Sequence, residues 1–239
     1  MKVFVAGGTG AVGRRLVPRL VAEGDHVIAL TRDAGKARWL SEVGASPVIA
    51  DALDRTAVRA AMAGSEPEVV IHQLTALSGV GNYKQFDREF ALTNQLRTEG
   101  TNYLLEGART AGVRRFIAQS YGNWNYARTG TGLKTEQDPF DATPPANQKQ
   151  SLAAIRYLES AVAGAEGIEG IALRYGNLYG PGTGLAKDGA IVAQIRGTSN
   201  AKAKAELGWA PQYPTCREGF RNGLGDVPVP GFGPLPAGL

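Results

Sequence analysis

The chain opens with a strand-like run that ends in a cluster of glycines and passes directly into a helical pattern. Residues 2–6 are mostly β-branched or aromatic, and Gly7, Gly8, Gly10 and Gly13 follow at once. A glycine turn between strand and helix lets the backbone approach a pyrophosphate, while the helix N-terminus faces its negative charge. An ordinary glycine-rich turn is the competing interpretation, but the strand-turn-helix context disfavours it. The opening therefore predicts a dinucleotide-binding site.

The glycines fit both Gly-x-Gly-x-x-Gly and Gly-x-x-Gly-x-x-Gly, and the end of the next strand bears on the choice of nucleotide. Residues 26–30 have strand character and run into Thr31 and Arg32. A site for NAD usually has an acid here for the ribose 2′-hydroxyl, whereas Arg32 can pair with a 2′-phosphate. Asp33 comes one position late and is more simply a helix N-cap. The sequence favours NADP and leaves NAD open.

Composition and charge narrow the class of protein. The net charge of +4 is spread along the 239 residues, which argues against a nucleic-acid partner. A single cysteine, Cys216, cannot form an intramolecular disulfide and suits a reducing compartment. No apolar run reaches membrane-spanning length, no signal peptide precedes the first strand, and His26 and His72 lack partners at metal-ligand spacing. We expect a cytoplasmic protein without a membrane partner or a metal.

Strand-like and helix-like segments alternate along most of the chain. This alternation predicts an α/β fold of the Rossmann type, a doubly wound parallel sheet with helices on both faces. We expect a dinucleotide-binding domain over residues 1–180, and a shortened substrate-side region with a Pro/Gly-rich tail over residues 181–239. Further strands are expected at 47–50, 68–72, 115–118 and 170–174, and helices at 11–23, around 90–105, around 152–162 and at 200–207.

Motifs spread over most of the chain recur together in one known family. They lie at residues 7–13, 51, 70–76, 93–94, 100–105, 112–117, 174–182 and 204–209. In this order they resemble the extended short-chain dehydrogenase/reductases, also called the NAD(P)-dependent epimerase/dehydratase family. The resemblance implies oxidoreductase or epimerase chemistry on a carbonyl or secondary alcohol of a sugar nucleotide or small metabolite. It also implies a homodimer.

The resemblance assigns cofactor contacts by position. Asp51 would bind the adenine amino group and Leu53 would pack on the ring. A helix N-cap is an equally weighted and compatible interpretation of Asp51, because Asp51 and Asp54 both precede a helical run. Asn94 would hold the long helix against the fourth strand, and Asn177 would either lie near the nicotinamide or serve a turn. The complete expected cofactor set is Gly7, Thr9, Gly10, Ala11, Val12, Gly13, Arg32, Asp51, Ala52, Leu53, Leu74, Thr75, Ala76, Asn94 and Asn177.

The catalytic pattern of the family is incomplete in this chain. Its members place a serine or threonine after the fifth strand and a Tyr-x-x-x-Lys pair on the next helix, where the lysine lowers the tyrosine pKa. Ser120 fits the first role, but the register set by Glu159 puts Ser151 and Ile155 at the positions of the pair. Tyr121 is the remaining phenol near the expected nicotinamide, unless it packs under the following loop. Ser120 and Tyr121 are the predicted catalytic residues.

Two functions remain open at this stage, an NAD(P)-dependent enzyme and a non-catalytic dinucleotide-binding sensor or scaffold. The resemblance favours the enzyme, whereas the missing pair favours the second function. So does an apparent internal deletion near residues 195–198, which shortens the substrate domain. Lys134 and Glu136 lie in a polar loop at 122–147 and receive no role, because charged loop residues are usually solvated.

Overall fold

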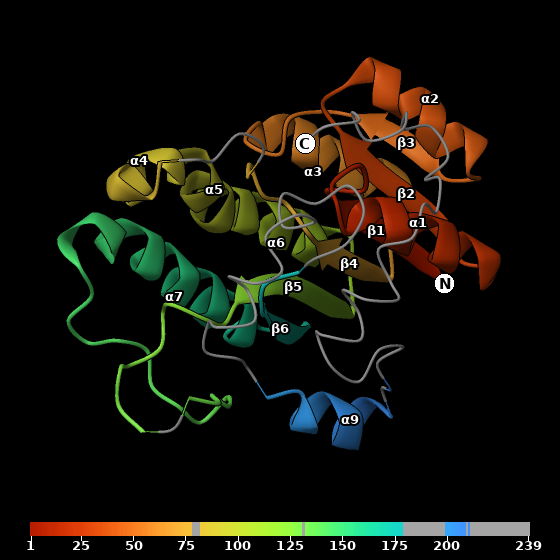
Figure 1. Ribbon diagram of the computed structural model, residues 1–239. Helices are drawn as coiled ribbons and strands as arrows, with labels where there is room; N and C mark the ends of the chain where they lie inside the picture. Colours follow the sequence, from red (N-terminus) through yellow and green to blue (C-terminus); the bar gives the residue numbers. More distant parts are fainter. Residues whose placement is uncertain (78–81, 131, 179–198, 209, 211–239) are drawn as a thin grey trace, which may run out of the picture. The chain divides into compact units, whose positions relative to one another are not determined.

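The computed structural model describes residues 1–77, 82–130, 132–178, 199–208 and 210 (Figure 1). The chain forms two compact units. The first consists of Met1–Ser120 and Pro144–Leu173, and the second of Tyr121–Thr143 and Arg174–Leu239. The boundary expected at residue 180 falls outside the described residues and stays a prediction.

A six-stranded sheet forms the frame of the fold, as predicted. Its strands are β1 (Lys2–Ala6), β2 (His26–Thr31), β3 (Ser46–Ile49), β4 (Val69–His72), β5 (Arg115–Tyr121) and β6 (Glu169–Tyr175). They lie in the order β3-β2-β1-β4-β5-β6, and the pairs β1–β2, β1–β4, β2–β3 and β4–β5 are parallel. This is the Rossmann order, in which ligands bind outside the carboxyl ends of the strands where the order reverses. Here that point lies between β1 and β4.

The helices follow the predicted alternation with one difference. They are α1 (Gly13–Ala22), α2 (Ala34–Glu42), α3 (Arg55–Ser65), α4 (Phe86–Glu89), α5 (Ala91–Gln95), α6 (Thr101–Thr110), α7 (Lys149–Ala163) and α9 (Ala201–Leu207). The single helix predicted around residues 90–105 is instead α5 and α6 joined by a π-helical turn at Leu96–Gly100. In the part of the chain that the structure describes, none of the helices is both long and apolar enough to cross a membrane.

Buried side chains on alternating positions of the strands fix helices to both faces of the sheet. Phe4 of β1 belongs to a core that includes Met62 of α3, Leu104 of α6 and Leu158 of α7. Residues of the opposite parity, such as Val5, are equally buried. On that face Val17 of α1 and Leu40 of α2 lie near Ala29 of β2, around the position of Gly8. Each large side chain buried in this way contributes about 1.5–3 kcal/mol, so the sheet is held rigidly between its helices.

Aspartates at two helix starts fix where the chain turns after β2 and β3. Asp33 caps α2 by accepting the backbone N–H of Gly35 at 2.8 Å, which confirms the predicted cap. Asp54 caps α3 by accepting the backbone N–H groups of Thr56 and Ala57, both at 3.0 Å. Each cap satisfies helix N–H groups that would otherwise lack a partner. Both caps lie next to residues that were expected to bind the cofactor.

Candidate functional site

The glycine turn between β1 and α1 is shaped by close backbone approaches. Gly7 has φ of 94°, and a Cβ at this position would lie 2.8 Å from the carbonyl group of Gln73. A Cβ at Gly13 would overlap the carbonyl oxygen of Gly7. The turn is closed by a hydrogen bond from the Gly10 N–H to the Gly7 carbonyl at 3.1 Å. Glycine is therefore required at both positions by geometry, because side chains would collide with fixed backbone.

The N-terminus of α1 is open to an anion. No side chain caps the helix at Val12, and its first turn contains no acidic residue. The nearest atom to a Cβ at Gly10 is the Gly7 carbonyl oxygen, at 3.4 Å. The partial positive charge of a helix N-terminus and an uncrowded glycine suit a phosphate group. The turn therefore fits the pyrophosphate of a dinucleotide.

Two residues expected at the adenosine end of the cofactor lie together at the ends of β2 and β3. Arg32 and Asp51 form an ion pair of 3.7 Å, with side chains 61% and 45% exposed. Asp51 also accepts the backbone N–H of Leu53 at 2.9 Å. Because Asp54 caps α3, the alternative that Asp51 is the helix cap does not hold. An ion pair this exposed contributes little to stability, so both side chains remain available to a ligand.

The loop after β4 is held by polar side chains behind it. The Leu74 N–H donates to His72 Nδ1 at 3.2 Å, and the Ala76 N–H donates to Thr93 Oγ1 at 3.0 Å. Sequence reasoning selected Leu74 and Ala76 but did not select His72 or Thr93 for this role. The threonine precedes Asn94, which was expected to hold the helix against β4. The loop after β4 therefore contacts α5 through Thr93 and not through Asn94.

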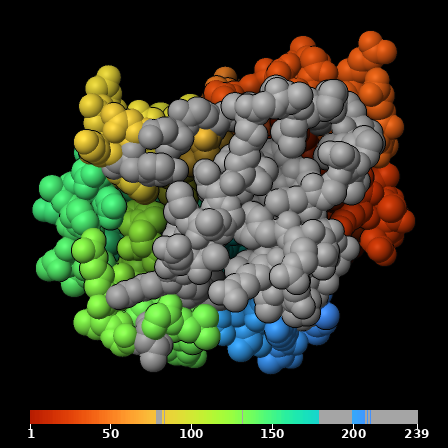
Figure 2. All heavy atoms as spheres, in the orientation of Figure 1, coloured from red at the N-terminus to blue at the C-terminus, as the bar shows by residue number. Residues whose placement is uncertain are grey.

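Asn94 instead points to α7, at the position where the family pattern requires a tyrosine. Its Nδ2 donates to Ser151 Oγ at 3.0 Å, and Ser151 Oγ donates to Asp87 Oδ1 at 2.7 Å. Asp87 also accepts the backbone N–H groups of Gln150 and Ser151, at 2.9 and 2.8 Å. Figure 2 shows the yellow surface around α4 beside the green surface of α7, where these bonds form. Ser151 is fully buried and serves to fix the start of α7.

The predicted catalytic serine on β5 and the residue at the family's lysine position on α7 are also engaged within the first unit. Ile155 is 1% exposed and belongs to the core. Ser120 is 1% exposed, and its hydroxyl donates to Glu159 Oε1 at 2.6 Å. Because side chains alternate along a strand, Ser120 shares the face of Phe116, which packs against the helices. The Ser120 proton is therefore committed to a carboxylate of α7.

In the second unit, the ends of β5 and β6 bring two predicted residues together. The Tyr121 hydroxyl donates to Asn177 Oδ1 at 2.5 Å. The phenol has a single proton, so its oxygen can only accept a hydrogen bond from a further group. Asn177 thus orients the phenol of Tyr121. The sequence around neither residue predicted this contact.

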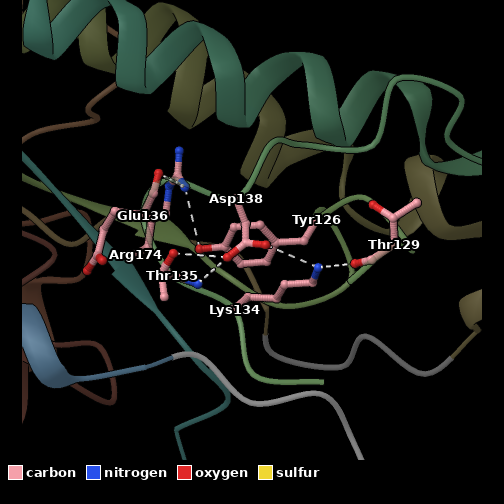
Figure 3. A network of polar contacts seen from close by, with 7 residues as sticks. All are labelled: Tyr126, Thr129, Lys134, Thr135, Glu136, Asp138 and Arg174. Atoms are coloured by element: carbon pink, nitrogen blue, oxygen red, sulfur yellow. Dashed lines mark hydrogen bonds and ion pairs between the residues drawn. The ribbon is translucent and has the colours of Figure 1, made fainter. Parts of the chain in front are cut away.

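A polar network in the second unit organises the loop after β5 (Figure 3). Lys134 is 1% exposed, and its ammonium donates to the Thr129 carbonyl and lies 3.3 Å from Asp138 Oδ1. Asp138 Oδ2 accepts the backbone N–H and the hydroxyl of Thr135, at 2.8 and 2.9 Å. These bonds, led by the backbone N–H of Thr135, lower the pKa of Asp138. The expectation that Lys134 is a solvated loop charge is wrong.

Arg174 at the end of β6 fastens the same loop. Its guanidinium carbon lies 4.3 Å from the ring centroid of Phe140 and 5.5 Å from that of Tyr126. One of its nitrogens donates to the Glu136 carbonyl at 3.3 Å (Figure 3). A guanidinium over aromatic rings is held by their electron-rich faces. The loop is therefore ordered by cations that the sequence presents only as scattered charges.

The family model for the NAD dependent epimerase/dehydratase family matches residues 3–210. The chain belongs to this family. A 3-diazoavenalumate denitrifying reductase from Streptomyces is 45% identical over 197 residues, covering 82% of this chain and 62% of that protein. This match to the epimerase/dehydratase family confirms the resemblance that the sequence motifs indicate.

Solved structures give the same result for the fold. A UDP-glucose 4-epimerase from Thermus thermophilus in complex with NAD is 28% identical with a TM-score of 0.62, covering 77% of this chain and 58% of that one. A UDP-glucose 4-epimerase from Thermotoga maritima with UDP-glucose is 26% identical with a TM-score of 0.61, covering 76% and 57%. The present family member thus spans between 57% and 62% of the length of these three relatives.

Proposed function

We propose that this chain is an NAD(P)H-dependent reductase of the epimerase/dehydratase family. The observation that carries the proposal is the cradle formed by Gly7 and Gly13 at an uncapped helix N-terminus. When bound there, the dinucleotide would supply a hydride. The exposed Arg32 at the end of β2 supports a preference for NADP, because a guanidinium can bind a 2′-phosphate through paired hydrogen bonds. Asp51 would hold the guanidinium in place.

The state of α7 favours a substrate that needs no proton from the protein. Reduction of a carbonyl creates an alkoxide that must be protonated, and the family pattern uses a tyrosine for this. Here Ser151 and Ile155 are buried, and the Ser120 hydroxyl donates to Glu159. Replacement of a diazonium group by hydrogen needs only a hydride. The C–N bond breaks with its electron pair leaving in N₂, and the hydride's pair forms the C–H bond.

The 45% identical relative is named for the reduction of a diazo compound with loss of nitrogen. We therefore propose a small diazonium compound as the substrate class, in preference to a sugar nucleotide. Tyr121, oriented by Asn177, would contact the substrate as a hydrogen-bond acceptor. Ser120 would support the site by holding α7 in place through its hydrogen bond to Glu159. A cytoplasmic location, supported by the single cysteine, and a homodimer, to be tested by sedimentation, complete the proposal.

The cofactor part is tested by titrating NADPH and NADH against the wild-type chain and the Arg32→Ala variant. Loss of a charge-assisted phosphate contact should weaken NADPH binding by about tenfold or more and leave NADH binding unchanged. Arg38→Ala is the matched control, because Arg38 pairs with Glu42 on the exposed side of α2. Equal affinities for both nucleotides in the wild type would refute the NADP preference.

The chemical part is tested with a benzenediazonium salt, measuring NADPH consumption and N₂ release against a reaction without protein. Tyr121→Phe and Ser120→Ala should keep turnover within about tenfold of the wild type, because no proton transfer is required. A loss of about 10²-fold or more would indicate proton transfer and refute this chemistry. Nucleotide binding without turnover on the diazonium salt, benzaldehyde or UDP-glucose would favour the non-catalytic alternative.

A further inference from the structure

A buried histidine lies directly behind the candidate cofactor loop. His72, the last residue of β4, is 1% exposed. Its Nδ1 accepts the backbone N–H of Leu74 at 3.2 Å, so Nδ1 carries no proton. Its Nε2 lies 3.1 Å from Thr101 Oγ1, and its ring meets Phe116 edge-on at 6.3 Å. These contacts from α6 and β5 fix the ring and leave Nδ1 pointing at the loop.

The backbone that His72 holds is the surface on which the glycine turn rests. A Cβ at Gly7 would lie 2.8 Å from the Gln73 carbonyl group and 3.1 Å from the Leu74 nitrogen. The Gln73 N–H in turn donates to the Ala6 carbonyl at 2.8 Å. Any shift of residues 73–74 would therefore move the surface against which Gly7 packs. The turn and the loop after β4 form one continuous wall at the β1–β4 reversal of the sheet.

We propose that His72 is a positioning residue for the dinucleotide, holding the loop after β4 against the glycine turn through the Leu74 N–H. The proposal rests on the proposed cofactor binding, since positioning is defined by its effect on the nucleotide. His72 is joined to the loop through the Leu74 N–H. It acts through two residues of backbone, at the site where the nucleotide would approach.

The surroundings of the ring keep its acceptor available at neutral pH. Burial lowers the pKa of His72 to about 4, partly offset by a backbone hydrogen bond with Leu96. Arg97, a buried cation on the π-helical turn, lowers the pKa further. The contacts from α6 and β5, Thr101 and Phe116, are uncharged. Protonation of Nδ1 would abolish the bond to Leu74, so this hold is confined to pH values above about 4.

Two variants separate the two nitrogens of the ring. In His72→Asn the amide oxygen falls near the position of Nδ1 and can still accept the Leu74 N–H. In His72→Gln the amide reaches toward Thr101 and the Leu74 N–H loses its acceptor. His26→Gln is the matched control, because His26 is the other histidine and lies at the exposed start of β2, 3.3 Å from Ser46. For each protein, NADPH affinity, hydrogen exchange of residues 73–76 and thermal unfolding are measured at pH 7.

We expect His72→Gln to weaken NADPH binding and raise amide exchange at Leu74 by about tenfold each, with His72→Asn close to the wild type. His26→Gln should change neither. Unchanged affinity and unchanged exchange in a folded His72→Gln variant would overturn the proposal. So would equal losses in both His72 variants, because these would show a structural role for the ring alone. A wild-type chain that binds no nucleotide would refute the proposed function, while the exchange data would still decide whether His72 holds the loop.

Discussion

Acidification should destabilise the fold through His72 by an amount that can be worked out in advance. The histidine has an ordinary pKa of 6.5 in the unfolded chain and about 4 in the folded protein. Between these values the unfolded state binds a proton that the folded state does not. The stability that His72 contributes is therefore fully present above pH 6.5 and is lost as the pH falls to about 4. A difference of roughly 2.5 pKa units corresponds to about 3 kcal/mol.

Urea unfolding of the wild type and of His72→Asn at pH 7, 5.5 and 4 isolates this effect. Carboxylates with lowered pKa values, such as Asp138, titrate in both proteins and cancel in the difference. We expect the gap in the free energy of unfolding between the two proteins to shift by about 3 kcal/mol in favour of the variant between pH 7 and pH 4. A gap that stays constant across this range would refute the reasoning.

Three further substitutions, two of them paired with a comparison variant, test the packing around the site, each followed by urea unfolding. Gly13→Ala should cost at least about 2 kcal/mol and abolish nucleotide binding, whereas Gly64→Ala in α3, where a Cβ meets nothing within 4 Å, should stabilise by about 0.5–1 kcal/mol. Asp87→Ala should cost about 2 kcal/mol by uncapping α7, about twice the cost of Asp54→Ala at α3. Arg174→Met should cost about 1–2 kcal/mol and speed protease cleavage within residues 122–143, and wild-type cleavage rates would contradict the role assigned to its ring contacts.

The fold could be predicted because its signals are local. The strand-turn-helix opening, the alternation of elements and the cap at Asp33 all lie within short windows of sequence, and the structure confirms them. The sequence also showed that Ser151 and Ile155 occupy the positions of the family's tyrosine and lysine, because the register along one helix is a local property. The choice between Asp51 and Asp54 as the cap needed backbone geometry, because both precede the same helix.

The contacts within the site could not be predicted, because they join residues distant in sequence. Asp87 caps a helix 64 positions later, and Tyr121 meets Asn177 across 56 positions. The bond from Ser120 to Glu159 joins β5 to α7 across 39 positions. Burial of Lys134 depends on partners within a loop that has no periodicity. The assignment of cofactor and catalytic roles to these residues stays a prediction.

Backbone hydrogen bonds close the base of the loop that Arg174 contacts. The base of the loop is therefore under different structural constraints from its tip. Tyr126 and Phe140 form an antiparallel bridge, the Ala127 N–H donates to the Pro139 carbonyl at 2.9 Å, and these bonds close the loop from one side. Once the base of a loop is closed, doubling the length of the enclosed segment costs only about 0.6 kcal/mol. Insertions between Tyr126 and Phe140 that leave the contacts of Lys134 with Thr129 and Asp138 intact are therefore nearly neutral for folding. The tip can diverge during evolution while the sheet and the base of the loop stay the same.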